Sequence, residues 1–376
     1  MAQSYRAVFF KILLSLPLLY SLDSLSLLKC SPLDYEYSIV LFLEYKGNKD
    51  FIVSDLEVPI PPNTSWQTSV IKNISLKPVS IIHHGANTFV RFRLTLSRFQ
   101  PLNIKISGML SLRSLDTPSS ELLISFSHYL KSISSKFLCF IQPTKWWNYS
   151  DPVISRVKES IYKEITLRNA TLKEVLDYLR RFVQRTLSYS KCKFRKGASK
   201  ALVDKVGDCS EYSDVYIALA RSLGIPARRV LGWVFMGFHA GKPILVGHAW
   251  AEILLPDIST WIPLETTFPS NVSINMDVGK LPENYIAFYI EDGTHDVNSP
   301  LVPEDESFLI SSEEWIPLSK ELWFSSSIII KPKLEDNPTL HSVRILRLLY
   351  ALSVLCFFVI LSIVLCISLL RRRFRK

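Results

Sequence analysis

The chain has 376 residues, 48% of them hydrophobic, and a formal net charge of +10. Residues 371–376 carry five of these positive charges and residues 1–29 carry a net two, which leaves +3 for residues 30–370. A basic balance of that size argues against a nucleic-acid partner. The sequence also contains no internal repeat, no glycine-rich phosphate loop and no cluster at metal-ligand spacing, so no cofactor is expected.

Residues 1–29 predict a secretory signal peptide. Arg6 and Lys11 precede the apolar run Ile12–Leu22. This run is too short to cross a bilayer and suits the hydrophobic region of a signal peptide. No clean Ala-x-Ala site follows, so the cleavage position stays open and an uncleaved N-terminal anchor remains the alternative.

Residues 30–135 predict an all-β module, with a β-sandwich as the natural architecture. Short β-branched or aromatic runs are separated by turn residues such as Gly47 and Pro61. The five strands expected are Tyr37–Tyr45, Phe51–Val58, Trp66–Ile74, Phe89–Leu96 and Ile104–Leu112.

Residues 136–293 are predicted to form a second domain of α+β class. Its entry holds Trp146 and Trp147, which could line a substrate groove or simply fill the space between domains. Apolar residues then recur at helical spacing over 172–187, which predicts a helix. Tyr189 follows that helix and is a candidate oxyanion donor, with a core tyrosine as the alternative.

A second helix is predicted from about Cys209 to Leu223. Asp208 is a favourable N-cap, and Gly224 supplies the left-handed residue that ends the helix. The apolar residues that recur at helical spacing within it are Tyr212, Val215, Tyr216, Leu219, Ala220 and Leu223.

The position of Cys209 in the first turn of this helix favours its thiolate form, because the positive end of the helix dipole lies there. Asp208, Glu211 and Asp214 oppose this effect with their own negative charges. A nearby imidazole is therefore needed to take or share the proton of the thiol.

The best candidate for that imidazole is His248, on a strand predicted over Ile244–Leu255. A second short strand starts at Trp261 and ends in Glu265, which could orient the imidazole as the third member of a triad. The tightest hairpin register places Ala251, not His248, opposite Glu265. A longer loop or a bulge is therefore expected between the strands.

These residues belong to four short motifs, Gly207–Glu211, Gly224–Arg228, His248–Glu252 and Trp261–Glu265. In this order and at this spacing they resemble the transglutaminase-like superfamily. Its core carries a Gly-x-Cys helix start, then Gly-Ile-Pro-Ala-Arg, then His-Ala-Trp, and then a Trp-led strand that ends in an acid. The resemblance covers about residues 150–290.

The resemblance implies a papain-like α/β core, with the thiol helix packed against an antiparallel sheet. It also implies acyl transfer from amides, to water in the peptidase and amidase members or to an amine in the crosslinking members. By the same resemblance Cys209 is the nucleophile, His248 the general base and acid, and Glu265 the third, usually aspartate, member. The family more often has Asp-Pro-Thr where this chain has Glu265-Thr266-Thr267, which puts the geometry of the third member in doubt.

Each of these residues also has a purely structural explanation. A cysteine on a helix among small and aromatic residues is ordinarily an inert packing residue, and Arg228 is expected to hold a carboxylate or a carbonyl. His83 and His84 are adjacent but have no third ligand at metal spacing, so no metal site is expected.

The C-terminal segments indicate a membrane anchor. Leu348–Leu370 has 23 residues without a charge, enough for about 34 Å of helix, which predicts a transmembrane helix. The basic residues 371–376 then form a cytoplasmic tail, and the catalytic region lies outside the cell membrane. Residues 294–345 predict a stalk or small β element. With these segments, the resemblance is to the membrane-anchored, extracellular, prokaryotic or archaeal type of the superfamily.

Two further features fit an exported protein. Cys139 and Cys192 are the pair that could form a disulfide outside the cell, with two unconnected buried thiols as the alternative. Five Asn-x-Ser/Thr sequons predict a glycoprotein: Asn63, Asn73, Asn148, Asn169 and Asn271.

Two functions of different class follow from the sequence. The first is a cysteine-dependent acyl-transfer enzyme that acts on protein amide bonds, hydrolytic as a peptidase or amidase, with transamidation also open. The second is a catalytically inactive surface binding or assembly protein whose β module recognises cell-envelope polymers. The partner is a protein or peptide in the first case and an envelope polymer in the second, and the oligomeric state stays open.

Overall fold

The computed structural model describes residues 33–333, except residues 99, 240–241, 256–258, 269–277, 295–311 and 318–320. Residues Pro32–Pro332 form one compact unit. The predicted signal peptide, transmembrane helix and basic tail lie outside the described residues. Among the residues described, no helix is long and apolar enough to cross a membrane.

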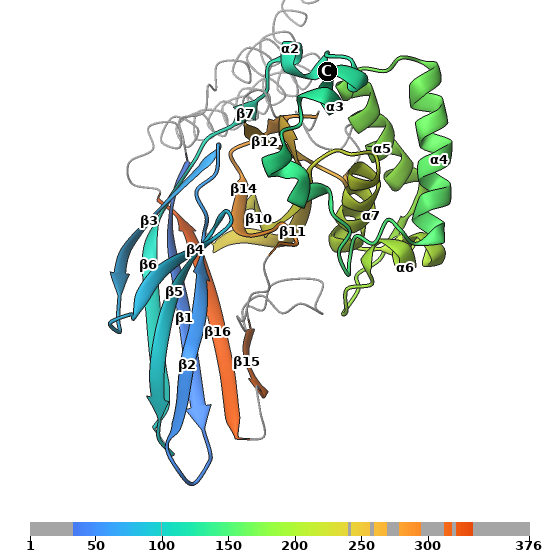
Figure 1. The fold of residues 1–376 in the computed structure, drawn as a ribbon. Helices are drawn as coiled ribbons and strands as arrows, with labels where there is room; N and C mark the ends of the chain where they lie inside the picture. Colours follow the sequence, from blue (N-terminus) through green and yellow to red (C-terminus); the bar gives the residue numbers. More distant parts are fainter. Residues whose placement is uncertain are drawn as a thin grey trace, which may run out of the picture. The chain divides into compact units, whose positions relative to one another are not determined.

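The N-terminal part is rich in β-strands, as the sequence predicts. One sheet has the order β15-β16-β1-β6-β3 and a second has the order β2-β5-β4 (Figure 1). All five predicted strands are present, and β4 is an additional one. Their bounds are β1 (Leu33–Tyr45), β2 (Phe51–Ile60), β3 (Gln67–Ile74), β4 (Ser80–His84), β5 (Asn87–Leu96) and β6 (Leu102–Leu112).

Alternation of side chains explains why these strands share one core. Every second residue of β1 from Tyr35 to Tyr45 is buried, and the inward residues of β2, β5 and β6 belong to the same hydrophobic cluster. Since successive side chains of a strand point to opposite faces, each strand contributes one face to this core.

The first sheet is completed from the other end of the described chain. β15 (Ser312–Pro317) and β16 (Leu322–Pro332) follow the second domain in sequence. β16 pairs with β1 along its whole length, from Tyr35 opposite Pro332 to Tyr45 opposite Leu322. The range 294–345 therefore supplies strands to the sheet that begins at residue 33.

The second domain packs helices against one face of a four-stranded antiparallel sheet with the order β12-β11-β10-β14 (Figure 1). This is the α+β arrangement, with the thiol helix packed against an antiparallel sheet, that the resemblance implies. The helices are α4 (Pro152–Leu167), α5 (Leu172–Thr186), α6 (Gly197–Asp204) and α7 (Cys209–Ser222). The strands are β10 (Ala227–His239), β11 (Lys242–Leu255), β12 (Thr260–Leu264) and β14 (Tyr285–Glu291).

Short elements connect these parts. They are β7 (Leu115–Asp116), α2 (Ser119–Leu122), α3 (Phe126–Ser132), the 3₁₀ helix η1 (Ser135–Ile141), β8 (Ser188–Tyr189), β9 (Val206–Gly207) and β13 (Lys280–Leu281). β8 runs parallel to β9 and holds the chain before α6 against the start of α7.

Buried polar side chains join the β-rich part to the second domain. The Gln67 side chain donates to the Ala287 carbonyl and accepts from the Ala287 N–H, both at 2.9 Å. Asn87 forms the same pair of hydrogen bonds with Ile290, at 2.6 and 2.8 Å. Both side chains are buried, and they bond to backbone groups of β14 in the way that a neighbouring strand would. These buried backbone groups are thus satisfied.

Trp66 forms a further link, because its Nε1–H donates to Oε1 of the fully buried Glu252 at 3.3 Å. Replacing Trp66 with phenylalanine should lower the free energy of unfolding by about 1–3 kcal/mol, because a buried carboxylate loses a donor. Urea denaturation measures this change. Trp323→Phe, at a half-buried position on β16, is the matched control and should cost less; an equal loss would contradict a specific role for the Trp66 hydrogen bond.

Candidate active site

Helix α7 places Cys209 at its first position, within one residue of the predicted bounds at each end. The Asp208 side chain accepts from the Ser210 N–H at 2.9 Å, and the Glu211 side chain accepts from the Asp208 N–H at 3.0 Å, so the helix starts with a capping box. A Cβ atom at Gly207 would lie 2.3 Å from the Cβ of Glu211. Only glycine therefore permits this tight approach, and Cys209 is held buried with 7% of its surface exposed.

Strand β11 places His248 beside the thiol. His248 is buried, forms a hydrogen bond with Cys209, and contacts Glu265 through Nε2 and Oε2 at 2.7 Å. Because Nε2 faces the carboxylate, Nδ1 is the nitrogen left to exchange a proton with the thiol. The structure thus brings together the three residues predicted as nucleophile, base and third member.

The hairpin register predicted from the sequence was wrong by one residue. Leu255 lies opposite Thr260, and Ala251 lies opposite Leu264 instead of Glu265. A shift of one residue moves every side chain of a strand to the other face. Glu265, which follows Leu264 directly, therefore falls on the face of β11 that carries His248. No bulge between β11 and β12 is needed.

Four donors fix the Glu265 carboxylate. Besides His248, Oε2 accepts from the Tyr285 hydroxyl at 2.9 Å, and Oε1 accepts from the backbone N–H groups of Thr267 and Phe268 at 2.7 and 3.3 Å. Although Glu265 has one methylene more than the aspartate usual in the family, its position is fully determined by these contacts.

The charges of this cluster support an imidazolium at His248. Burial alone would lower the pKa of His248, but the charge of Glu265 and the hydrogen bonds to Cys209 and Glu265 raise it to about 10. Burial would raise the pKa of Glu265, and the charge of His248 outweighs it and lowers that pKa. Burial and the charge of Glu265 raise the pKa of Tyr285, which therefore stays a neutral donor.

Aromatic rings surround the imidazole. Phe268 and Trp250 lie roughly parallel to the His248 ring, with centroids at 5.2 and 6.1 Å, and Tyr285 meets it edge-on at 5.9 Å. Sequence reasoning missed Phe268 and Tyr285. Phe268 lies in a loop, and Tyr285 lies in a strand with no motif around it, so neither position carries a pattern that would point to the site.

Tyr189 lies beside Cys209 but is not a core residue. Its backbone pairs with Gly207 in the short parallel sheet, and 55% of its surface is exposed. Burial of part of the ring and the neighbouring charges of Cys209 and Asp208 raise the pKa of Tyr189 to about 12. The hydroxyl thus keeps its proton at neutral pH, and its role as an oxyanion donor stays a prediction.

Behind the thiol, α7 is anchored by buried ion pairs. Arg195 contacts Asp214 through two nitrogens at 2.6 and 2.9 Å and also contacts Glu291 at 2.8 Å. The Arg229 guanidinium lies 2.8 Å from Glu291. The negative charge that Asp214 was expected to set against the thiolate is therefore offset by an arginine.

The paired tryptophans belong to this buried network. Trp147 is fully buried and donates to Asp214 at 2.8 Å, with the guanidinium of Arg221 stacked 4.3 Å from its ring. Arg195 lies 4.6 Å from the ring of Trp146. The role of filling space between elements thus fits Trp147, and lining of a groove does not. Arg228 pairs with Glu252 at 2.6 Å, as its expected structural role requires.

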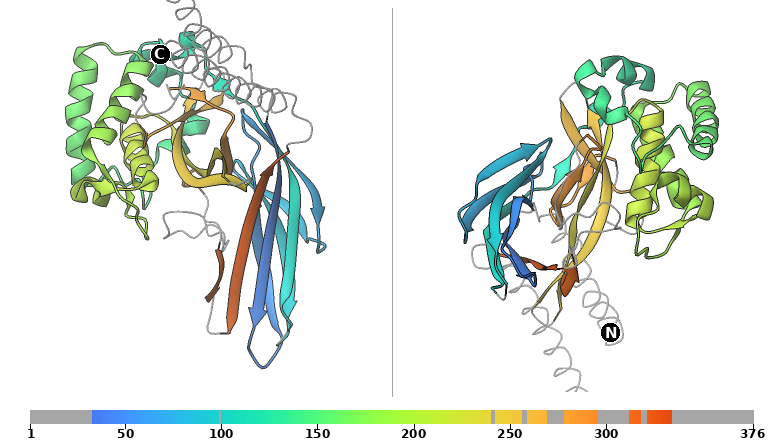
Figure 2. Two further views of the ribbon diagram at one scale, coloured as in Figure 1. Left: turned by 180° about the vertical axis from the view of Figure 1, so that it is seen from behind. Right: turned by 60° about the horizontal axis from the view of Figure 1, so that its bottom comes forward.

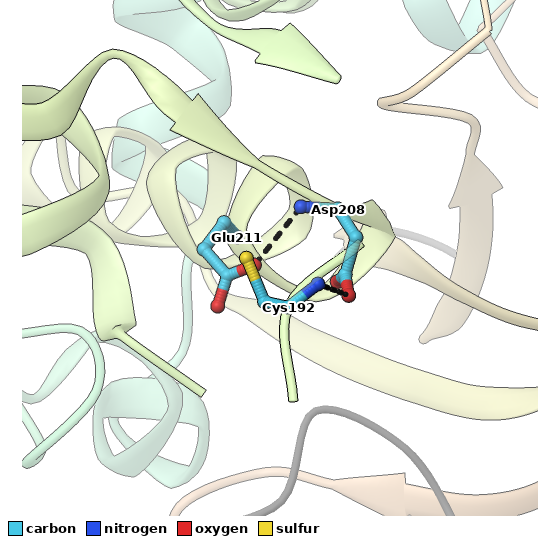
Figure 3. Close-up of side chains that lie close together, drawn as sticks. All are labelled: Cys192, Asp208 and Glu211. Carbon is cyan, nitrogen blue, oxygen red and sulfur yellow. Dashed lines mark hydrogen bonds between the residues drawn. The ribbon is translucent and has the colours of Figure 1, made fainter. Parts of the chain in front are cut away.

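Cys192 lies next to the N-terminus of α7, together with Asp208 and Glu211 (Figure 3). The carboxylates accept backbone N–H groups, Asp208 that of Cys192 at 3.0 Å and Glu211 that of Lys196 at 2.9 Å. Burial and the charges of Glu211 and Asp208 raise the pKa of Cys192 to about 11. These contacts make the two carboxylates part of the capping structure of α7.

Cys139, Cys192 and Cys209 are reduced in the structure. The disulfide between Cys139 and Cys192, one of the two alternatives, is thus not formed. Cys139 is exposed and Cys192 is partly exposed, so the second alternative, two buried thiols, was wrong about their burial.

Comparison with known proteins gives one family match and several structural neighbours. Residues 159–266 match the family model of the transglutaminase-like superfamily. A protein of Cytophaga hutchinsonii assigned as a cysteine protease shares 12% identity and has a TM-score of 0.48, over 82% of this chain and 93% of that chain. The periplasmic domain of TgpA from Pseudomonas aeruginosa bound to ethylmercury shares 16% identity with a TM-score of 0.32, over 65% and 94%. No curated protein matches the chain. Residues 159–266 thus carry a segment similar to the core of the transglutaminase-like superfamily.

Proposed function

We propose that the chain is a cysteine-dependent acyl-transfer enzyme that acts on protein amide bonds. The observation that carries this proposal is the linked set of Cys209, His248 and Glu265, in which a buried imidazole contacts the thiol on one side and a carboxylate at 2.7 Å on the other. This arrangement has the connectivity of a nucleophile, a base and an orienting acid.

The residues would divide the reaction as follows. His248 takes the proton of Cys209, and the sulfur attacks the amide carbonyl to give a tetrahedral intermediate. His248 then gives its proton to the leaving nitrogen as the C–N bond breaks, which leaves a thioester on Cys209. Water or an amine, deprotonated by His248, attacks the thioester and releases the acyl group as an acid or a new amide. Glu265 orients the imidazole throughout and stabilises its protonated form whenever it occurs.

Hydrolysis is the favoured outcome, because water is always available outside a cell, and transamidation is the second. The proposal places the catalytic region outside the cell, on an anchor formed by residues 348–370, as a single-pass membrane glycoprotein. Its partners would be protein or peptide substrates, including those of the cell envelope. An inactive binding or assembly protein is the outcome if the thiol proves inert.

p-Nitrophenyl acetate tests this function without knowledge of the natural substrate. The purified chain should release p-nitrophenol in a burst of one equivalent, with the acetyl group located on Cys209 by peptide mass spectrometry. Cys209→Ala should abolish the burst, and Cys139→Ala, which removes an exposed free thiol, should keep it. A native chain with no burst above Cys209→Ala would contradict an acyl-transfer function. Added glycine ethyl ester then separates transfer to amines from hydrolysis.

The pKa of His248 provides a second test, through Glu265→Gln. Removing the carboxylate charge should lower this pKa from about 10 toward the ordinary 6.5. Since a raised pKa stabilises the native fold fully below pH 6.5 and this effect is lost as the pH rises through 10, the variant should be less stable than the native chain below pH 6.5, and the difference should shrink as the pH rises to 10. The Cε1–H signal of His248 in NMR spectra recorded against pH reports the midpoint.

Glu159→Gln, at an exposed position on α4, is the control and should leave the His248 midpoint in place. A midpoint that stays near 10 in Glu265→Gln would show that Glu265 does not hold the imidazolium.

A further inference from the structure

Beyond the catalytic residues, β11 has an edge that no other described strand covers. β12 pairs with β11 only from Ala251 to Leu255, whereas β11 begins nine residues earlier, at Lys242. β10 covers the other edge of β11 down to Lys242 (Figure 2). In the part of the chain that the structure describes, residues Lys242–Trp250 therefore have a strand on one side only.

The contacts of Glu265 explain why β12, among the described strands, does not continue along this edge. Its carboxylate accepts from the N–H groups of Thr267 and Phe268, which turns the chain after β12, and the Phe268 carbonyl then accepts from Gln184 of α5 at 2.9 Å. The chain leaves the sheet at the level of His248. The same turn that orients the imidazole thus stops β12 from covering the rest of β11.

The backbone groups that face this edge can be assigned. The Leu254 N–H donates to the Pro226 carbonyl, on the side of β10. Since backbone groups of alternate residues point to the same side of a strand, even-numbered residues of β11 bond to β10. Leu245 and Gly247 therefore direct their N–H and C=O groups to the open edge. Gly247 is adjacent to His248, and Leu245 is about 10 Å from it along the strand.

Side chains beside this edge are apolar and exposed. Val246 and Ile244 lie on the same face of β11 as His248, with 48% and 38% of their surfaces exposed. Phe268, which stacks on His248, is 40% exposed. Exposed apolar side chains next to unpaired strand groups are the features by which sheets bind an added strand.

We propose that the β11 edge at Leu245 and Gly247 binds the substrate as an extended peptide segment, with an apolar side chain against Val246 and Phe268. This inference rests on the proposed function and adds the substrate class. The substrate is an extended, apolar segment of polypeptide, and not a side chain on the surface of a folded protein. Backbone pairing supplies affinity that does not depend on sequence, and the apolar contacts supply selectivity. The pairing also carries the bound peptide directly to the residue that activates the thiol.

Acetyl-Leu-Val-Gly chloromethyl ketone tests the inference on the full chain. The Cys209 sulfur forms a C–S bond with the methylene carbon and chloride leaves, so the rate of labelling reports binding of the peptide part. Chloroacetone carries the same electrophile without a peptide, and each rate is divided by the chloroacetone rate of the same variant. The native chain should show a ratio of at least about tenfold, which two backbone hydrogen bonds can supply. A peptide reagent whose backbone nitrogen is methylated at the residue that pairs with the edge cannot donate this hydrogen bond. Its labelling ratio should lose the tenfold gain.

Variants locate the binding to this edge. Gly247→Pro lacks the N–H and should lower the ratio about tenfold relative to Gly247→Ala, which keeps it. Val246→Glu should lower the ratio by a similar factor. Val70→Glu is the matched control, because Val70 is also 48% exposed, on β3, and its ratio should equal that of the native chain.

The outcomes separate the two proposals. A reactive thiol whose peptide ratio is near one, or is unaffected by N-methylation and by Gly247→Pro, would overturn the inference and leave the function standing. If chloroacetone labels Cys209 no faster than N-acetylcysteine, the proposed function fails. If instead a second copy of the chain occupies the edge, sedimentation will show a dimer that Gly247→Pro dissociates, and the peptide inference is overturned.

Discussion

Replacing His248 with alanine should slow the burst of p-nitrophenol by about 10²–10⁴-fold, the range that a positioned general base contributes. His248 is the imidazole that bonds to Cys209, and its raised pKa shows that the protein stabilises the imidazolium that forms when the thiol is deprotonated. Stopped-flow absorbance at pH 7 measures the burst rate.

His128→Ala, at an exposed position on α3, serves as the control and should keep the native burst rate. If His248→Ala also keeps it, with the fold intact by circular dichroism, then the thiol reacts without a base and the proposed division of roles is wrong.

Replacing Arg195 with methionine should have the largest effect on stability, about 3–5 kcal/mol, because it leaves buried carboxylates unpaired. The side chains of Arg195 and Asp214 are 1% and 0% exposed, and Asp214 lies on the helix that begins with Cys209. Although burial alone would raise the pKa of Glu291, the charges of Arg195 and Arg229 lower it to about 2, so this carboxylate is also ionised.

Urea denaturation measures the loss. Arg181→Met, which removes an exposed arginine of α5, is the matched control and should change the free energy of unfolding by less than about 0.5 kcal/mol. A loss in Arg195→Met that is no larger than in Arg181→Met would show that the buried ion pairs do not hold α7 in place.

Local sequence determined most of the helix and strand bounds. Thr171 and Glu174 form a capping box before α5, and Asp208 and Glu211 form another before α7, so residues close in sequence fix the start of both helices. The β-branched and aromatic runs likewise gave five strands of the N-terminal part. In these cases residues within a few positions of each other fix the structure, and the pattern is visible in the sequence.

Contacts between distant residues were not visible in that way. The return of β16 to β1 joins residues about 290 positions apart, and no local pattern specifies such a pairing. Arg195, Asp214 and Glu291 come from separate parts of the chain, and as single charged residues they carry no sequence pattern that pairs them. Burial and pairing appear only when the fold brings them together.

The active site shows both situations. Cys209, His248 and Glu265 were predicted from four motifs, and the structure places them in contact. The register of the hairpin was not predictable, because the same two strands can pair with loops of different length and the loop length decides the pairing. A one-residue difference there decides whether Glu265 faces the imidazole or the helices, so motif identity was sufficient for the residues but not for their geometry.

The alkylation of Cys209 by iodoacetamide at pH 7 tests activation of the thiol most directly, since it needs no substrate. The second-order rate constant is compared with that of N-acetylcysteine as a free thiol and with that of His248→Ala, and labelling of Cys209 is confirmed by peptide mass spectrometry. We expect Cys209 in the native chain to react faster than the free thiol and faster than in His248→Ala. Equal rates for all three would contradict a nucleophile activated by His248.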